Sequence, residues 1–433
     1  MNVLMLTSEF YPSWGGIGRY VTELARNMGD EMKSHVLTPK RPMFGEGHDI
    51  DCAASTGNES PELPSNVSVH YLGTARDTFM HYFYFQVACW RSVRRLVKQY
   101  DVDIVHSQNT MPDLLLTPKL LGVPIVTTVH TIEEERLPTV RLAAAASGVQ
   151  PSKLERSEKL SLLFSFGLRG ASRVYYRNSR NYIAVSQWTK QQILKHHNVN
   201  AERIRVIRNG VDRKVFTPQN RNRAKAYFPE LADTDSPKVL FLSRMTASKG
   251  AFILMRAIPR ILDAVDASFV FAGPNQSLPH NAGDHVVQLG YVCHEQTPFL
   301  YALADVFTLP SFYENCPLAM LEAMASGRPI VASNISGISE LVTHEKDGLL
   351  TQCGNVDQLA ETIITLIEDD GLRKKLGRNA RRSVQVHNDW KKVATEVSDY
   401  YISVLNENSA HQPAATSRMH AGWKGRPMRE HNS

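Results

Sequence analysis

The chain alternates short apolar runs with longer stretches in which apolar residues recur at helical spacing. Residues 3–6 are all apolar and predict a buried parallel strand, and the glycines that follow predict a loop. Residues 17–28 then predict a helix. Further strands are expected at residues 35–38, 67–71, 104–106, 125–129 and 182–185, with helical patterns between several of them. This alternation indicates parallel α/β packing.

The same pattern restarts in the second half of the chain. A strand at 239–242, a polar loop and a helix at 251–262 repeat the opening order, and further strands are expected at 268–273, 287–290, 306–309 and 329–332. We therefore expect an α/β fold of two Rossmann-like domains that face each other, with phosphate-binding loops at the carboxyl ends of their strands.

The domain boundaries are expected where the pattern weakens. The first domain should span 1–208 and the second 209–388, with a proline-containing interdomain region at 209–237. One apolar stripe predicts a last helix over 389–406. Residues 407–433 have few apolar residues and predict a disordered basic tail.

Composition narrows the class of protein. With 433 residues, 42% of them hydrophobic and 21% charged, the chain has ordinary globular composition, which excludes fibrous and wholly disordered proteins. Its mean hydropathy is −0.28, and no run of about 18 uncharged apolar residues predicts a spanning helix. The net charge of +6, half of it in residues 408–433, is too dilute to indicate nucleic acid as a partner.

Cysteine usage and the first residues bear on the compartment. The five cysteines are scattered, odd in number and form no C-x-x-C pair, which is typical of reduced thiols in a cytosolic protein. The first residues lack a basic flank and do not resemble a secretory signal. We therefore expect a cytoplasmic protein.

A glycine-rich loop follows the first predicted strand. Gly15, Gly16 and Gly18 would let backbone amides approach a phosphate at a helix N-terminus, although a plain tight turn explains them equally well. Their spacing differs from G-x-G-x-x-G, and the second strand ends without an acid for a ribose, at Leu37 and Thr38. These features argue against a dehydrogenase.

Two cations lie in the corresponding loop of the second half. Arg244 and Lys249 stand between a buried strand and a helix, where a guanidinium and an ammonium suit a diphosphate. The alternative is a solvated loop with two surface cations.

The most distinctive local feature is a pair of glutamates around a predicted short helix. Glu314 precedes the helix, Asn315 is predicted to cap it and Gly327 to end it. Glu322 lies within an otherwise apolar stretch, where a carboxylate needs a partner such as a ribose diol or a sugar hydroxyl. A structural ion pair is the alternative.

The order of these features resembles glycosyltransferase family 4, the glycosyl transferases group 1, which has the GT-B fold. The resemblance extends from Met1 to about residue 405, and its specific part is the glutamate pair with seven residues between. The weaker motifs occur in the family's order: Gly15-Gly16, residues 128–131, 184–186 and 209–212, and Arg244 with Lys249.

The resemblance implies a role for each residue. The backbone of Gly16, beside Gly15, would meet the donor phosphate, and Arg244 and Lys249 would neutralise the leaving diphosphate. Glu314 would contact the transferred sugar, Glu322 the ribose, and His130 the reaction centre. Donor contacts are also expected from Asn315 and from the backbone amides of Cys316 and Leu318.

The resemblance also implies a reaction. A sugar would pass, with retention of configuration, from a UDP- or GDP-sugar to a glycan, glycolipid or small-molecule acceptor, without a cofactor or a required metal. The last helix would cross back onto the first domain. Two departures from the family pattern concern the sugar pocket: Thr131 stands where an Asp is common, and Asn315-Cys316-Pro317 replaces a glycine-containing sequence.

Some alternatives stay open at this point. A binding-only nucleotide-sugar sensor, a GT-B epimerase or phosphorylase and a nucleic-acid binder are the other functions. Asp101-Val102-Asp103 resembles a D-x-D metal motif but is interpreted as a polar strand entry. The acceptor is expected at loops within residues 131–157.

Two basic helical patterns in the first domain suit an anionic membrane surface. Contact with the cytoplasmic face of a membrane competes here with core helices that carry solvated arginines. One pattern is Trp90, Arg91, Arg94, Arg95 and Lys98, and the other is Phe164, Phe166, Arg169, Arg173, Arg177 and Arg180.

Overall fold

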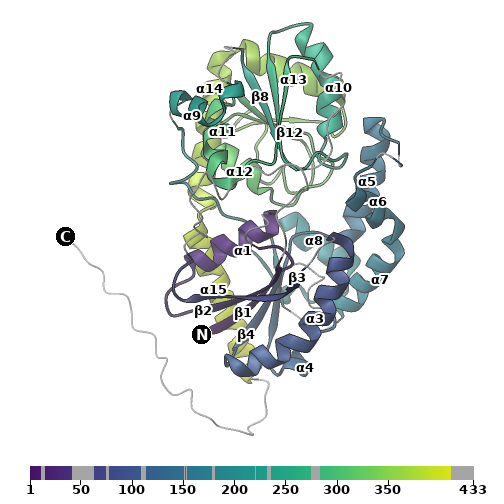
Figure 1. The fold of residues 1–433 in the computed structure, drawn as a ribbon, viewed down its shortest axis with the longest axis vertical. Helices are drawn as coiled ribbons and strands as arrows, with labels where there is room; N and C mark the ends of the chain where they lie inside the picture. The colour runs from purple at the N-terminus through teal and green to yellow at the C-terminus, as the bar shows by residue number, and fades with distance from the viewer. Residues whose placement is uncertain are drawn as a thin grey trace, which may run out of the picture.

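The protein folds into two α/β domains, each built on a parallel sheet flanked by helices (Figure 1). The computed structural model describes residues 1–10, 15–40, 63–74, 78–108, 114–150, 152, 154–177, 181–219, 221–231, 236–274 and 283–410. The predicted two-domain Rossmann-like architecture is confirmed. Most of the predicted tail lies outside the described residues.

The first sheet has the strand order β3-β2-β1-β4-β5-β6-β7. Central strand β1 (Asn2–Leu6) pairs in parallel with β2 (Lys33–Lys40) and β4 (Ile104–Gln108), and its apolar run is fully buried. The other strands are β3 (Val67–Thr74), β5 (Ile125–Val129), β6 (Asn181–Ala184) and β7 (Ile204–Val206). Strand β7 is too short, with Arg205 at its centre, for an apolar run to indicate it.

Helices connect these strands. They are α1 (Gly16–Asn27), α3 (Thr78–Gln99), α4 (Pro118–Leu121), α5 (Glu133–Ser147), α6 (Arg156–Leu163), α7 (Ser165–Tyr176) and α8 (Gln187–His196). Helix α1 lies on the side of the first domain that faces the second domain (Figure 1).

The second sheet has the order β10-β9-β8-β11-β12-β13. Its strands are β8 (Lys238–Leu242), β9 (Ser268–Ala272), β10 (Val286–Gly290), β11 (Val306–Leu309), β12 (Ile330–Ser333) and β13 (Leu349–Thr351). Its helices are α10 (Ala251–Leu262), α11 (Thr297–Leu303), α12 (Leu318–Ala325), α13 (Val356–Glu368) and α14 (Asp370–His387). All pairings in this sheet are parallel.

The second half of the predicted interdomain region belongs to the second domain. Helix α9 (Arg221–Tyr227) and a 3₁₀ turn at Pro229–Leu231 bury Ala224, Phe228 and Leu231 in its core. These side chains follow helical spacing that the surrounding prolines interrupt in the sequence.

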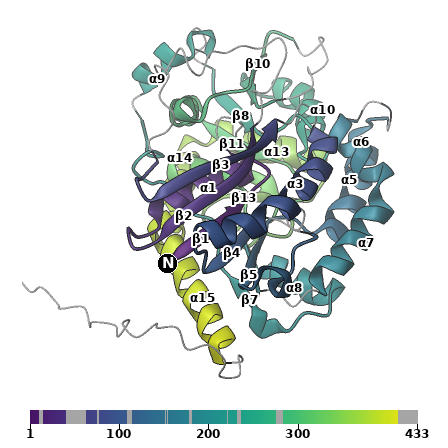
Figure 2. The same ribbon diagram turned by 60° about the horizontal axis from the view of Figure 1, so that its bottom comes forward.

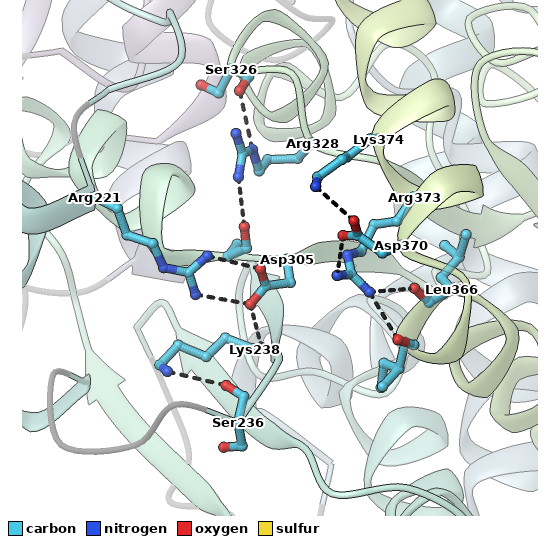
Figure 3. Close-up of polar contacts among 12 residues, drawn as sticks. Arg221, Ser236, Lys238, Asp305, Ser326, Arg328, Leu366, Asp370, Arg373 and Lys374 are labelled. Atoms are coloured by element: carbon cyan, nitrogen blue, oxygen red, sulfur yellow. Dashed lines mark hydrogen bonds and ion pairs between the residues drawn. The ribbon is translucent and has the colours of Figure 1, made fainter.

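An ion pair joins α9 to the sheet (Figure 3). Two nitrogens of Arg221 donate to the Asp305 carboxylate at 2.8 and 2.9 Å, and the backbone N–H of Lys238 donates to it at 2.8 Å. A cavity of about 300 Å³ opens beside these residues. It lies at the amino ends of β8 and β11, so it is on the edge of the sheet opposite the predicted phosphate loops.

The last helix crosses from the second domain to the first, as predicted (Figure 2). Helix α15 (Trp390–Ala410) buries its apolar stripe in the same core as β1 and α1. It extends to Ala410, four residues beyond the predicted end.

The cysteines depart in part from the expectation of reduced thiols. Cys89, Cys316 and Cys353 are free, whereas Cys293 is disulfide-bonded. Among the described helices, none is both long and apolar enough to span a membrane.

Candidate functional site

The predicted site residues lie in loops at the carboxyl ends of strands from both sheets. Such ends share one edge of a parallel sheet, so the loops of the two domains meet where the domains face each other. The residues are Gly15 and Gly16 after β1, His130 after β5, Arg244 and Lys249 after β8, and Glu314 to Leu318 after β11.

The N-terminus of α1 is a candidate site for an anion. Gly15 is the N-cap and provides no side-chain hydrogen bond to the first turn. Gly16 is exposed, with open space where a side chain would begin, whereas a Cβ on Gly15 would overlap the Glu9 carboxylate. The first-turn amides of a helix have no partner within the helix, and together with the helix dipole they favour a phosphate at this position.

Lys249 and Glu314 contact each other directly. The Lys249 ammonium lies 2.6 Å from Glu314 Oε1, and the Ser311 hydroxyl donates to the same oxygen at 3.1 Å. Arg244 is exposed and forms no ion pair with any residue that the structure describes. The glutamate therefore compensates the lysine charge, while the arginine charge stays available.

A tight turn holds the Glu314 backbone. The Ser336 hydroxyl and the Gly337 N–H donate to the Glu314 carbonyl at 2.7 and 3.1 Å. A Cβ on Gly337 would lie 1.6 Å from the Asn315 carbonyl oxygen, so only glycine fits there. Sequence reasoning missed this turn because nothing local relates residues 336–337 to Glu314.

The prediction that Asn315 caps α12 is wrong. The helix begins at Leu318, and Pro317 occupies the N-cap position without a side-chain hydrogen bond. The Asn315 amide instead donates to the His130 carbonyl at 2.6 Å and to the Tyr313 hydroxyl at 3.0 Å. Because His130 belongs to the first domain, Asn315 joins the two domains at the site.

Other hydrogen bonds join the domains close by. The Tyr313 hydroxyl accepts from the Ile132 N–H of the first domain at 2.8 Å, and the amide of Asn209, in the interdomain region, donates to the Cys316 carbonyl at 2.7 Å. Burial raises the pKa of Cys316 to about 12, so its thiol is neutral. Cys316 and Leu318, whose backbone amides are predicted to contact the donor, thus follow residues that hydrogen bonds to other segments hold in place.

Two carboxylates further from the glutamate pair also join the domains. Glu340 accepts from the first backbone amides of α8, Gln187 and Trp188, at 2.9 and 2.6 Å. Glu158 of α6 accepts from the backbone and the hydroxyl of Ser248, at 3.0 and 2.6 Å. Ser248 stands directly before Lys249, so the first domain contacts the loop of the predicted diphosphate cations.

Glu322 is a buried carboxylate with a polar partner on its own domain. The Tyr301 hydroxyl donates to its Oε2 at 3.1 Å, and Nδ1 of His294 lies 3.9 Å from its Oε1. Burial raises the pKa of Glu322 to about 7, although Arg19 of α1 and the Tyr301 hydrogen bond favour the ionised form. The carboxylate therefore titrates near neutral pH.

His130 is a neutral imidazole beside the domain junction. Burial lowers its pKa to about 3. Its Nε2 lies 3.1 Å from Gln108 Oε1, and its ring packs edge-on against Tyr20 with centroids 4.8 Å apart. A neutral ring at pH 7 cannot supply an imidazolium, so it acts as a hydrogen-bonding group.

The D-x-D sequence lies away from this site. Asp103 accepts from the Asn2 N–H at 2.8 Å, at the amino ends of β1 and β4. This contact agrees with its interpretation as a polar strand entry. Within the described ranges no group of three or more His, Cys, Asp or Glu side chains is arranged to hold a metal ion.

Comparison with known proteins identifies the family. The model of Glycosyltransferase Family 4 matches residues 14–215, and that of Glycosyl transferases group 1 matches residues 222–383. The chain belongs to glycosyltransferase family 4. Together the two matches cover most of both domains.

Individual proteins agree with this membership. The chain is 28% identical to a GDP-mannose-dependent alpha-(1-6)-phosphatidylinositol monomannoside mannosyltransferase of Mycobacterium tuberculosis, over 92% of this chain and 97% of that one. It is 31% identical to an uncharacterized glycosyltransferase of Methanocaldococcus jannaschii over 51% of this chain and 59% of that one. Its fold resembles sucrose-phosphate synthase from Thermosynechococcus elongatus, with a TM-score of 0.72, 18% identity, and 94% and 99% coverage.

One region of this glycosyltransferase differs from the prediction. Residues 131–157, expected to form acceptor loops, contain α5 and the start of α6. Val140, Ala143 and Ala144 of α5 pack into the core of the second domain, and Arg256 of α10 donates to the Ala146 carbonyl. The apolar residues of α5 recur at helical spacing in the sequence, so this pattern could have predicted the helix.

Proposed function

We propose that this glycosyltransferase moves a sugar from a UDP- or GDP-sugar to a glycan, glycolipid or small-molecule acceptor with retention of configuration. The observation that carries the proposal is the contact of Glu314 with Lys249 in a loop fixed by both domains, beside the exposed Arg244. The donor specificity printed for the mycobacterial mannosyltransferase supports a GDP-sugar as one candidate.

The charges suit the reaction. Departure of a nucleoside diphosphate places negative charge where Arg244 and Lys249 are available, and positive charge develops on the sugar. When a diphosphate approaches Lys249, the ammonium can turn from Glu314 toward it, which leaves the carboxylate for a sugar hydroxyl. In this proposal the two cations and the α1 amides supply the positive potential, and no metal is required.

A donor screen tests the proposal. Release of nucleoside diphosphate would be measured for UDP-, GDP- and ADP-sugars with the purified full chain. Turnover of one UDP- or GDP-sugar is the expected result. Binding without turnover of any donor would instead indicate a nucleotide-sugar sensor, an alternative that the family relatives do not favour.

Removing the charged side chain of Arg244 or Lys249 should lower kcat/KM for the donor at least about tenfold. The reason is that a hydrogen bond to a charged group contributes roughly 1.5–3 kcal/mol. The variants are Arg244→Ala and Lys249→Ala, and kcat/KM for the donor is the measurement. Arg260→Ala is the matched control, since Arg260 pairs with Asp357 and Glu361 on the exposed side of the same domain. Unchanged kinetics in both test variants would exclude a role for these cations.

The raised pKa of Glu322 predicts a pH dependence. A ribose diol donates to a carboxylate, so nucleotide affinity should fall as the pH is lowered from 8 to 6 through the pKa of about 7. The Glu322→Gln variant should bind more weakly at pH 8 and lose this dependence. Calorimetric titration with the nucleoside diphosphate measures both, and a wild-type affinity that is flat from pH 6 to 8 would contradict the assignment.

The raised pKa of Glu322 also makes the folding stability depend on pH, in the opposite direction to that of an acid in a salt bridge. The folded state holds the proton more tightly than the unfolded state, so this group favours folding at low pH and loses that contribution as the pH rises through about 7. Glu322→Gln should therefore gain melting temperature relative to wild type at pH 8 and not at pH 4.

We also propose that helix α7 rests on an anionic membrane surface. Phe166 and Val174 of α7 are 92% and 53% exposed, and Leu163 just before it is 73% exposed. Exposed arginines 169, 173 and 177 follow the same helical stripe. Helix α3 is a weaker candidate, because it buries Cys89, Val93, Leu96 and Val97 and presents its cations as a solvated face.

Vesicle binding tests this surface. Phe166→Asp combined with Leu163→Asp should reduce cosedimentation with vesicles that contain anionic lipid by several-fold, because each change removes an apolar contact and adds a negative charge that the anionic surface repels. Leu194→Asp, at an exposed apolar position on α8, is the control. Equal binding of both proteins would show that α7 is not the contact.

A further inference from the structure

A buried chain of polar side chains connects the crossing helix α15 to His130. Tyr401 of α15 lies with its hydroxyl 2.5 Å from Nδ1 of His106 on β4. The amide nitrogen of Gln108 lies 3.2 Å from Nε2 of His106, and its amide oxygen lies 3.1 Å from Nε2 of His130. Tyr401, His106 and Gln108 are all fully buried.

Each imidazole in this chain carries one proton. Burial lowers the pKa of both His106 and His130 to about 3, so neither is protonated twice at neutral pH. The position of each single proton is then set by the partners of the ring nitrogens. His106 has partners on both nitrogens, Tyr401 at Nδ1 and Thr128 and Gln108 at Nε2.

The tyrosine decides the tautomer of His106. Within the described part of the chain, His106 Nδ1 is the partner of the Tyr401 hydroxyl. If the Tyr401 hydroxyl donates to Nδ1 of His106, its proton has an acceptor. If Nδ1 instead donates to the hydroxyl oxygen, the buried hydroxyl proton is left without an acceptor, which costs free energy. His106 then carries its proton on Nε2, where the Thr128 hydroxyl oxygen accepts it at 2.7 Å.

The tautomer of His106 in turn sets the orientation of the Gln108 carboxamide. A protonated Nε2 on His106 cannot accept from the Gln108 amide nitrogen that lies 3.2 Å away. A half-turn of the carboxamide removes this conflict between two donors, because it places the oxygen toward His106 and the amide nitrogen toward His130. Nε2 of His130 then accepts, and its proton lies on Nδ1. His130 as a residue is half-buried, and Nδ1 is the ring nitrogen that Gln108 does not contact.

We propose that Tyr401, His106 and Gln108 are positioning residues that hold His130 in its Nδ1-protonated form, so that a neutral imidazole presents an N–H to a donor oxygen. The inference rests on the proposed transferase function, in which His130 lies beside the transferred sugar. It gives α15 a second role beyond covering the first domain. The group that such an N–H suits is an oxygen lone pair of the sugar or of the leaving diphosphate.

Nitrogen-15 NMR of side-chain-labelled histidine in the full chain tests the inference, with the His130 signals assigned by their loss in His130→Ala. Wild type should show His130 protonated on Nδ1. Gln108→Glu presents only acceptors, so it should place a proton on Nε2 and lower kcat at least about tenfold. Tyr401→Phe removes the donor that biases His106 and should give a mixture of tautomers with reduced kcat.

The adjacent tyrosine of the same helix provides a matched control. The Tyr400 hydroxyl donates to the Arg203 carbonyl at 2.8 Å, outside the chain, so Tyr400→Phe should leave the His130 signals and kcat unchanged. A wild-type His130 protonated on Nε2, or His130 signals that do not move in Gln108→Glu, would overturn the inference. Failure of the proposed function is distinguishable, because the wild-type chain would then turn over none of the donors while the nitrogen-15 signals would still report the His130 tautomer.

Discussion

Replacement of Glu314 by glutamine should lower kcat by roughly ten- to a hundredfold while leaving the affinity for free nucleoside diphosphate nearly intact. A hydrogen bond to a charged group contributes roughly 1.5–3 kcal/mol, which corresponds to that range of rates. The proposed partner of Glu314 is the transferred sugar, whose charge changes most in the transition state, so the loss should appear in kcat. Steady-state kinetics and calorimetric titration together measure it.

Two variants serve as comparisons for Glu314→Gln. Glu322→Gln should chiefly raise the donor KM, because a ribose contact changes little during the reaction. Ser311→Ala removes a neutral donor to the same Glu314 oxygen and should have a smaller effect. If Glu314→Gln abolished nucleotide binding and Glu322→Gln did not, the two assignments would be exchanged.

Deletion of the chain from Asp389 onward should leave the first domain unable to fold stably. The deletion removes Trp390, Val393, Val397, Tyr401 and Val404 from a shared core. Burial of each such side chain contributes about 1.5–3 kcal/mol, so the loss approaches the whole stability of a typical domain, roughly 5–15 kcal/mol. Thermal unfolding followed by circular dichroism measures it.

The control for this deletion is a truncation that keeps the helix. Deletion from residue 411 leaves all of α15 in place and should not change the melting temperature. Equal melting temperatures for the two truncated proteins would contradict the packing of α15 on the first domain.

The fold was largely predictable because buried parallel strands are continuous apolar runs. Residues 125–129, 306–309 and the helix 251–262 coincide with the observed elements. Strand β7 and strand β13 are three residues long and give no such run. Helix α9 was hidden because neighbouring prolines interrupt its pattern, although its apolar face completes the second core.

The site was predictable only where residues share a loop. Arg244 and Lys249 are close in the sequence, as are Glu314 and Glu322, and the contact between Lys249 and Glu314 joins the two pairs. The partners that fix these residues come from distant segments. Gly337 against the Asn315 carbonyl and Tyr401 against His106 depend on tertiary packing that no local pattern encodes.

The anomeric configuration of the first product tests the central claim most directly. The full chain would be incubated with the UDP- or GDP-sugar that it turns over, and the anomeric proton of the transferred or released sugar would be followed by NMR before mutarotation. The proposed retaining transfer predicts the donor's own configuration in the product, with nucleoside diphosphate released in equal amount. An inverted anomer would contradict retaining transfer at this site.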